Sequence, residues 1–346
     1  MEDGRTGEQE ASAEQETGGR WPLEGHFTCA SGLLVVPECL GQSFQTRTAT
    51  YELTITLPEL DAADAGAPLR RPPWKFNPEG VAPTTSVNEE WGTVASTRTR
   101  NSDGTWPAYN AAVRQCIVAT TVEAGNDEQF REAARVFADE LAVWWPSVTD
   151  WLGVLTGQDF VGLGIQQRSI LSDGFHAWSG DADGIRRAGY GSFLDVVPGR
   201  VQALDRDQLQ RAFDLGASGQ RPAVEWLLIR DARSLLRAGD YRRAVIDAGS
   251  ATELSLTELL DRRLASVDPV IRDTLMDRNR GLDRRADLTR ALQAGTVPNT
   301  FAEKLNRPRT RATHGKETIT MDQARDALTV ASDIVEQAHP LANFTP

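Results

Sequence analysis

The apolar residues of this chain repeat with two different periods, and the change from one to the other falls near Gly219. Before that point, in residues 49–57, apolar side chains alternate with threonine and glutamate, which is typical of a half-buried β-strand. After it, in residues 240–264, apolar side chains recur every three or four positions, which predicts a helix with one buried face. Because the two periods follow one another along the chain, we expect an α+β fold with the strands first and the helices last.

Residues 21–219 are expected to form a mixed domain in which strands dominate. The segment Cys116–Val122 is rich in β-branched residues and predicts a second, more buried strand, and strand-like sequence returns between residues 160 and 200. Residues 1–20 contain no large apolar residue apart from Met1. Such a segment cannot bury enough surface to offset the entropy lost on folding, so we expect a disordered acidic tail.

Two helices are expected inside this strand-rich domain. Asn126 is a suitable N-cap, because its side chain can accept a hydrogen bond from the first turn of a helix. Ser147 is expected to cap a second, shorter helix that ends at Gly157. The two helices carry three tryptophans, Trp144, Trp145 and Trp151. We expect these rings to pack in the core or against the C-terminal helices, and a recognition surface is the alternative.

Residues 220–346 are expected to form an all-α bundle of helices with short connections. Asp240 begins a long helix, and Pro269 suits the first turn of another. Two further helix starts are indicated by pairs with the spacing of a capping box, Thr300 with Glu303 and Thr320 with Gln323. The sequence therefore predicts three parts: the tail, the strand-rich domain and the helical bundle.

The distribution of charge indicates where an anionic ligand would bind. The 346 residues carry a net charge of −12, which argues against a protein that coats nucleic acid non-specifically. Residues 220–346 hold 20 lysines and arginines against 18 aspartates and glutamates, whereas the residues before them are strongly acidic. An anionic substrate is therefore expected to bind to the bundle.

We expect a cytoplasmic protein without a membrane-spanning segment. No apolar run approaches the roughly 20 residues that cross a bilayer, and the N-terminus lacks the layout of a signal peptide. Three cysteines are an odd number in a long chain, which fits a reducing compartment better than a disulfide framework. His26, Cys29 and Cys39 have spacings that resemble part of a zinc site, but a matching fourth ligand is missing. We therefore expect core packing, and neither a metal nor a cofactor.

The candidate functional motif is the segment Arg309–Gly315, with the sequence RTRATHG, ahead of the last expected helix. The simplest interpretation is a basic helix end, where cations complement the terminal carbonyl groups. Five residues at about 100° each would place Arg309 and His314 about 140° apart on a regular helix. In one copy of the motif the two side chains therefore point in different directions, which suits a shared pocket poorly. Two copies that meet across a two-fold axis can build one pocket from both chains.

In this context the C-terminal part resembles the HEPN superfamily, small helical bundles that often dimerise. The family signature is an arginine, then a polar residue that is usually asparagine, then a histidine four to six residues after the arginine. The resemblance covers about residues 222–341, and includes the long helix expected over 240–264 and the last helix expected over 319–341. Thr310 stands where asparagine is usual, and it can still donate and accept a hydrogen bond.

Catalytic HEPN proteins are metal-independent endoribonucleases, so the resemblance implies RNA as the substrate and a homodimer with a composite site. It implies that His314 is the general acid or base and that Arg309 holds the phosphate. These residue types suit the chemistry, because histidine titrates near neutral pH and a guanidinium matches phosphate oxygens in a bidentate way. Thr310, Arg311 and Lys316 are expected to contact the RNA.

The resemblance also implies a biological setting, because ribonucleases of this kind are often deployed in phage defence or toxin systems. The N-terminal domain is then expected to sense a phage-derived or protein trigger. Two alternatives stay open. One is a non-catalytic HEPN bundle that serves in dimerisation or binding, which Thr310 favours. The other is a toxin or antitoxin component that acts together with a nucleotidyltransferase.

Overall fold

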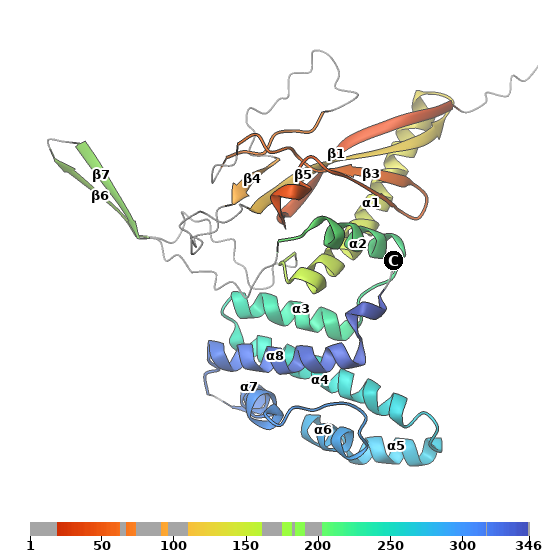
Figure 1. The fold of residues 1–346 in the computed structure, drawn as a ribbon, viewed down its shortest axis with the longest axis vertical. Helices are drawn as coiled ribbons and strands as arrows, with labels where there is room; N and C mark the ends of the chain where they lie inside the picture. The colour runs from red at the N-terminus through yellow and green to blue at the C-terminus, as the bar shows by residue number, and fades with distance from the viewer. Residues whose placement is uncertain are drawn as a thin grey trace, which may run out of the picture.

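The chain folds as α+β, with an antiparallel sheet in its N-terminal part and helices in its C-terminal part (Figure 1). This order confirms the fold class that the two hydrophobic periods predict. The structure is a computed structural model. It describes residues 19–62, 67–73, 91–95, 110–160, 175–181, 184–190, 203–315 and 317–344.

The strands of the main sheet are β1 (Gly19–Val35), β2 (Ser43–Arg47), β3 (Glu52–Thr56), β4 (Gly92–Ala95) and β5 (Asn110–Ala124). They pair in the order β1-β5-β3-β2, and β4 pairs with β5 as well, so β5 is the central strand. The alternation predicted for β3 is confirmed, because Leu53 and Ile55 are buried while their neighbours are not. Two further strands, β6 (Phe175–Asp181) and β7 (Gly184–Tyr190), form a separate hairpin.

The expected acidic tail is shorter than predicted. Gly19 and Arg20 already belong to β1, where they pair with Ala124 and Glu123 of β5. Pairing with a central strand satisfies the backbone of these two residues, although their own side chains contribute little apolar surface. Residues 1–18 lie outside the described residues.

A single long helix, α1 (Asp127–Thr156), covers the region where two helices were expected. Asn126 is its N-cap, as predicted, and accepts a hydrogen bond from the backbone N–H of Gln129 at 2.9 Å. Gly157 ends the helix with a φ of 70°, a left-handed conformation that glycine adopts without strain.

The prediction of a second helix capped by Ser147 is wrong, because α1 continues through Pro146. A proline inside a helix removes one backbone hydrogen bond and costs about 3 kcal/mol. The buried stripe around it offsets this cost, since each large apolar side chain contributes about 1.5–3 kcal/mol when it is fully buried. The stripe comprises Trp144, Val148, Trp151 and Leu152.

Helix α2 (Arg206–Ala217) returns to the sheet and completes the N-terminal core. Its first turn is closed by a capping box between Asp205 and Gln208. Phe213 of this helix contacts Phe44 of β2 edge-on, with 5.7 Å between the ring centroids, and stacks on Trp144 at 5.8 Å. The core therefore includes the sheet, α1 and α2.

The remaining helices form the bundle: α3 (Val224–Arg237), α4 (Tyr241–Arg263), α5 (Pro269–Arg278), α6 (Leu282–Ala291), a π-helical turn η3 (Ala302–Asn306), α7 (Arg307–His314) and α8 (Met321–Ala338). The predicted starts at Asp240 and Pro269 are confirmed, as is the capping box of Thr320 with Gln323. In Figure 1, α3 and α8 lie side by side below α2, and α5, α6 and α7 form the far end.

The second predicted capping box, Thr300 with Glu303, is wrong. The N–H of Phe301 is bonded to the carbonyl of Pro298, so Thr300 lies inside a turn, and its side chain does not cap the helical turn that follows. Thr300 instead contributes a backbone hydrogen bond, because its carbonyl accepts the N–H of Lys304 at 2.8 Å. The helical turn that follows has no side-chain cap.

The end of α1 joins the N-terminal part to the bundle. Trp151 is fully buried, its indole N–H donates to the carbonyl of Gln220 at 2.8 Å, and its ring contacts Phe344 at 5.0 Å between centroids. Arg233 of α3 donates to the carbonyl of Val154, and burial lowers the pKa of Arg233 to about 10. Core packing of Trp151 is therefore confirmed.

This junction predicts that Trp151→Ala lowers the free energy of unfolding by about 3–5 kcal/mol, because truncation leaves a cavity between two packed parts. Urea titration followed by circular dichroism measures the loss. Val143→Ala is the matched control on the same helix, since Val143 is 72% exposed. It should change stability by less than about 0.5 kcal/mol. Equal effects of the two variants would show that Trp151 is not part of the core.

Candidate functional site

The predicted motif lies on α7, a short helix that packs against α4 and α8. Pro308 and Ala312 are the buried residues of α7 and form the side that faces the bundle. Thr310, Arg311 and His314 are exposed, and Arg309 is half-buried. Lys316 lies outside the described residues.

Arg309 packs across the backbone of α4. A Cβ atom added at Gly249 of α4 would lie only 2.6 Å from Cγ of Arg309, so this position has room for glycine alone. One turn further along α4, Oε2 of Glu253 lies 3.4 Å from Nη2 of Arg309. The missing side chain at Gly249 therefore lets the arginine reach the carboxylate. Both side chains are 29% exposed, so water screens this ion pair only in part.

Glu253 faces a second guanidinium, that of Arg285 on α6. Nη1 of Arg285 lies 4.0 Å from Oε1 of Glu253 and donates to the backbone carbonyl of the same residue at 3.3 Å. It also donates to the hydroxyl of Thr257. Two guanidinium groups thus share one carboxylate, which leaves a local net charge of +1. In the described part of the chain, the buried Nε atoms of Arg309 and Arg285 have no hydrogen-bond partner.

His314 is the last residue of α7 and is exposed. The chain leaves the helix at Gly315, which adopts an extended conformation while its N–H still donates to the carbonyl of Arg311 at 2.8 Å. A Cβ at Gly315 would lie 2.8 Å from that carbonyl oxygen, so the close turn requires glycine. Within the described residues the imidazole of His314 has no hydrogen bond or ion pair, so it is accessible to a ligand.

The other two predicted contact residues on α7 already have partners. The hydroxyl of Thr310 donates to the carbonyl of Asn306 at 2.9 Å, one turn earlier in the helix. Nε of Arg311 lies 3.2 Å from a carboxylate oxygen of Glu317, and both side chains are largely exposed. Exposed pairs of this kind contribute about 0–1 kcal/mol, so Arg311 can exchange Glu317 for a phosphate at little cost.

The structure places Arg309 and His314 on one helix but not in one pocket. Arg309 faces α4, His314 faces solvent, and the described residues show no direct contact between the two side chains. This separation follows from their divergence on a regular helix.

Three residues near the motif were not identified from the sequence, namely Arg242, Gly249 and Arg285. A signal existed for Gly249, because a glycine in the middle of a long helix costs about 1 kcal/mol and indicates a close approach by another group. Arg285 lies 24 residues before Arg309 in the sequence, and no motif spacing connects the two. Only the packing of α6 and α7 on α4 brings them to Glu253.

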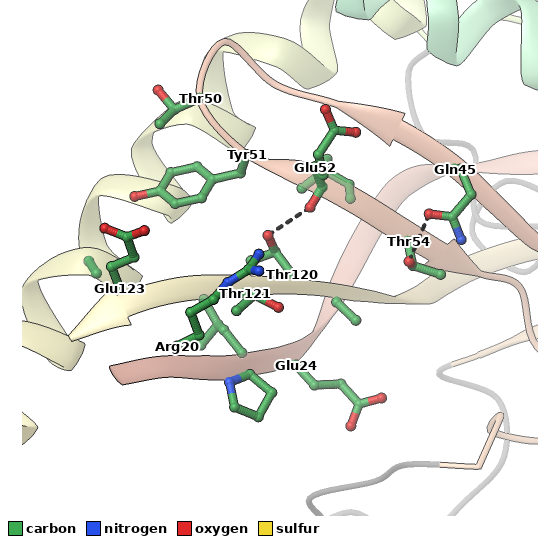
Figure 2. A pocket seen from close by; sticks show the side chains of 15 residues that line it. Arg20, Glu24, Gln45, Thr50, Tyr51, Glu52, Thr54, Thr120, Thr121 and Glu123 are labelled. Atoms are coloured by element: carbon green, nitrogen blue, oxygen red, sulfur yellow. Dashed lines mark hydrogen bonds between the residues drawn. The ribbon is translucent and has the colours of Figure 1, made fainter. Parts of the chain in front are cut away.

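A surface cavity of about 780 Å³ lies elsewhere, on the sheet of the N-terminal part (Figure 2). It opens where β3 and β5 separate, because these strands pair only over residues 54–56 and 117–119. The hydroxyl of Thr120 crosses the gap and donates to the carbonyl of Glu52 at 2.7 Å. Arg20 and Glu123 are among the side chains around the opening, so its lining mixes charged and apolar groups.

The cysteines are buried, as core packing predicts. The thiol of Cys39 donates to the carbonyl of Leu204, and burial together with nearby Asp205 raises its pKa to about 11. Cys116 interacts with Cys29, and that hydrogen bond together with burial raises the pKa of the Cys116 thiol. Among the residues that the structure describes, no group of histidine, cysteine and carboxylate side chains has the arrangement of a metal site.

Comparisons of the chain with protein families, with curated proteins and with solved structures found no match. The resemblance to the HEPN superfamily therefore depends on the motif and on the order of the helices around it. In the described part of the chain, every helix is too short or too polar to span a lipid bilayer.

The contact between Arg309 and α4 predicts that Gly249→Ala destabilises the protein. Alanine in place of glycine normally stabilises a helix interior by about 1 kcal/mol. Here the new Cβ overlaps the stem of Arg309, and overpacking of this kind costs about 1–3 kcal/mol. Urea titration should therefore show a less stable protein, and the double variant Gly249→Ala/Arg309→Ala should recover the stability that the overlap removes.

Gly25→Ala is the matched control, because a Cβ at Gly25 meets nothing within 4 Å. This variant should be as stable as the wild type or slightly more so. If Gly249→Ala alone proved more stable than the wild type, Arg309 would not pack on α4.

Proposed function

We propose that the protein is a metal-independent endoribonuclease of HEPN type that cleaves RNA at a site shared by two chains. The observation that carries the proposal is the arrangement on α7. There Glu253 and Gly249 fix the guanidinium of Arg309, while the imidazole of His314 stays exposed at the end of the same helix. The net positive charge of the group formed by Arg285, Glu253 and Arg309 favours an anionic ligand at this position.

The chemistry needs two proton transfers and one anion-binding group. The 2′-hydroxyl of the RNA attacks the adjacent phosphorus, and the neutral imidazole of His314 accepts the hydroxyl proton. The bond from phosphorus to the 5′-oxygen breaks, and the imidazolium of His314 formed in the first step gives its proton to that oxygen, while Arg309 comes from the second chain. Arg309 stabilises the negative charge that accumulates on the phosphorane oxygens. The products are a 2′,3′-cyclic phosphate and a 5′-hydroxyl.

The proposed setting is the cytoplasm, in a phage-defence or toxin system. The N-terminal part would then respond to a phage-derived or protein trigger and act on the bundle through their common junction at Trp151. Arg311 and Lys316 would contact the RNA backbone beside the cleaved bond, with Thr310 between the two main site residues.

A non-catalytic binding or dimerisation module is the second candidate, and one observation favours it. The hydroxyl of Thr310 donates to the carbonyl of Asn306, so its proton is engaged within the helix. An asparagine amide at this position would have further donors for a substrate. On this alternative the motif would bind RNA or a partner such as a nucleotidyltransferase without cleaving RNA.

His314→Ala is predicted to slow RNA cleavage by about 10²–10⁴, because it removes the proton-transfer group. Stability should stay within about 0.5 kcal/mol of the wild type, since His314 is exposed. The assay uses mixed RNA with excess EDTA, and gel electrophoresis follows the products. Arg307→Ala is the matched control, because Arg307 is an exposed cation on the same helix.

Two results would contradict the nuclease assignment. One is cleavage by His314→Ala at the wild-type rate, which would point to a contaminating ribonuclease. The other is the absence of cleavage by the wild type under all conditions, which would leave the binding module as the function of the bundle.

The shared site predicts that two inactive variants restore activity when they are mixed. His314→Ala supplies an intact Arg309, and Arg309→Ala supplies an intact His314, so a mixed dimer contains one complete pair across the two chains. The wild type should also have about twice the 37.9 kDa mass of one chain in light scattering. A monomer at micromolar concentration, or a mixture that stays as inactive as its parts, would exclude a site composed of both chains.

A further inference from the structure

Arg242 lies in the first turn of α4, beside the end of α7. Its Nε donates to the backbone carbonyl of Ala312 at 2.7 Å. Ala312 is fully buried and precedes His314 by two residues. The hydrogen bond therefore ties the guanidinium of Arg242 to the end of the helix that carries His314.

This bond has a local structural cause. The last four carbonyl groups of a helix lack partners within the helix, and they accept hydrogen bonds from nearby cations. In α7 the carbonyl of Arg311 accepts the N–H of Gly315, and the carbonyl of Ala312 accepts Nε of Arg242. Arg242 thus takes part in closing α7 with one of its five donors.

The Nη groups of Arg242 are available to bind a ligand. Its side chain is exposed, and among the described residues neither Nη atom has an ion-pair or hydrogen-bond partner. Two other exposed arginines of the bundle differ, since Arg262 pairs with Glu258 and Arg290 pairs with Asp287. Arg242 is held by a neutral carbonyl, so its full positive charge remains available.

The neighbouring charges do not cancel this cation. Asp240 is the nearest carboxylate in the sequence, and it accepts the backbone N–H of Arg243 and lies 4.0 Å from the guanidinium of that residue. Arg243 therefore shares the charge of Asp240, whereas Arg242 does not.

We infer that Arg242 binds a backbone phosphate of single-stranded RNA next to His314, as a second phosphate contact beside Arg309. The inference rests on the proposed function in taking RNA as the ligand. The two Nη atoms form the outer edge of a planar fork that matches two phosphate oxygens, while Nε keeps the fork in place. Lysine has three donors on one nitrogen, so it cannot present two parallel N–H groups in a fixed planar fork.

The experiment measures binding of a fluorescent 12-nucleotide RNA with 2′-O-methyl groups, which the proposed reaction cannot cleave. Fluorescence anisotropy at several salt concentrations gives the affinity and its dependence on salt. For single-stranded nucleic acid, loss of one phosphate contact lowers the slope of log K against log salt by about 0.7. We expect this decrease for Arg242→Ala, and a weaker affinity than wild type for Arg242→Lys.

Arg263→Ala is the matched control at the other end of α4. Nε of Arg263 donates to the carbonyl of Leu292 at 3.0 Å, so this variant also removes an arginine that holds a neutral carbonyl. It should leave the affinity and the salt slope unchanged. Equal slopes for Arg242→Ala and Arg263→Ala would overturn the inference, and so would the absence of RNA binding by the wild type.

The failure of the inference and that of the proposed function can be told apart. A wild-type protein that binds the modified RNA but leaves unmodified RNA intact would refute the nuclease, while a selective defect of Arg242→Ala would still support the phosphate contact. Should Arg242→Ala unfold, Arg242→Lys replaces it as the test. Wild-type affinity and slope in that variant would show that a guanidinium fork at this position makes no specific contact.

Discussion

The candidate site depends on α4, whose small side chains let several other helices approach closely. Ala248, Ala251 and Thr252 are fully buried in this helix, and α3, α7 and α8 all pack against it (Figure 1). At Gly249 the approach is closest, because the stem of Arg309 lies directly over the backbone. Small residues bury little area of their own, so their effect comes from the dense packing that they allow between larger neighbours. The same packing sets the position of the arginine.

The helical bundle also shares structure with the strand-rich part. Val154, near the end of α1, packs in the core of the bundle, whereas Trp151 packs in the N-terminal core one turn earlier. Arg230 of α3 forms an ion pair with Asp150 of α1, and the side chain of Arg230 is only 11% exposed. One helix therefore contributes to both cores. Helix α1 thus contacts α3, which packs directly on α4.

The sequence predicted those parts of the fold in which local patterns and burial agree. The alternation in β3 and the cap at Asp240 were predictable, because each depends on residues close together in the chain. Pro146 shows where local rules fail, since the burial of neighbouring aromatic rings outweighs the helix-breaking effect of proline. The partner of Arg309 was not predictable from spacing, because Glu253 is 56 residues away and reaches it only through the packing of α7 on α4.

The geometry of α7 limits how its two main residues can act together. Within one chain, packing holds Arg309 against α4, and a rotation of its guanidinium towards His314 would break the contact with Glu253. His314 is free to meet another molecule, since it lies at the exposed end of the helix. On the proposed function, a phosphate held by Arg309 of one chain would therefore meet the imidazole of a second chain. The ion pair that separates the two residues in one chain thus favours a site built from two.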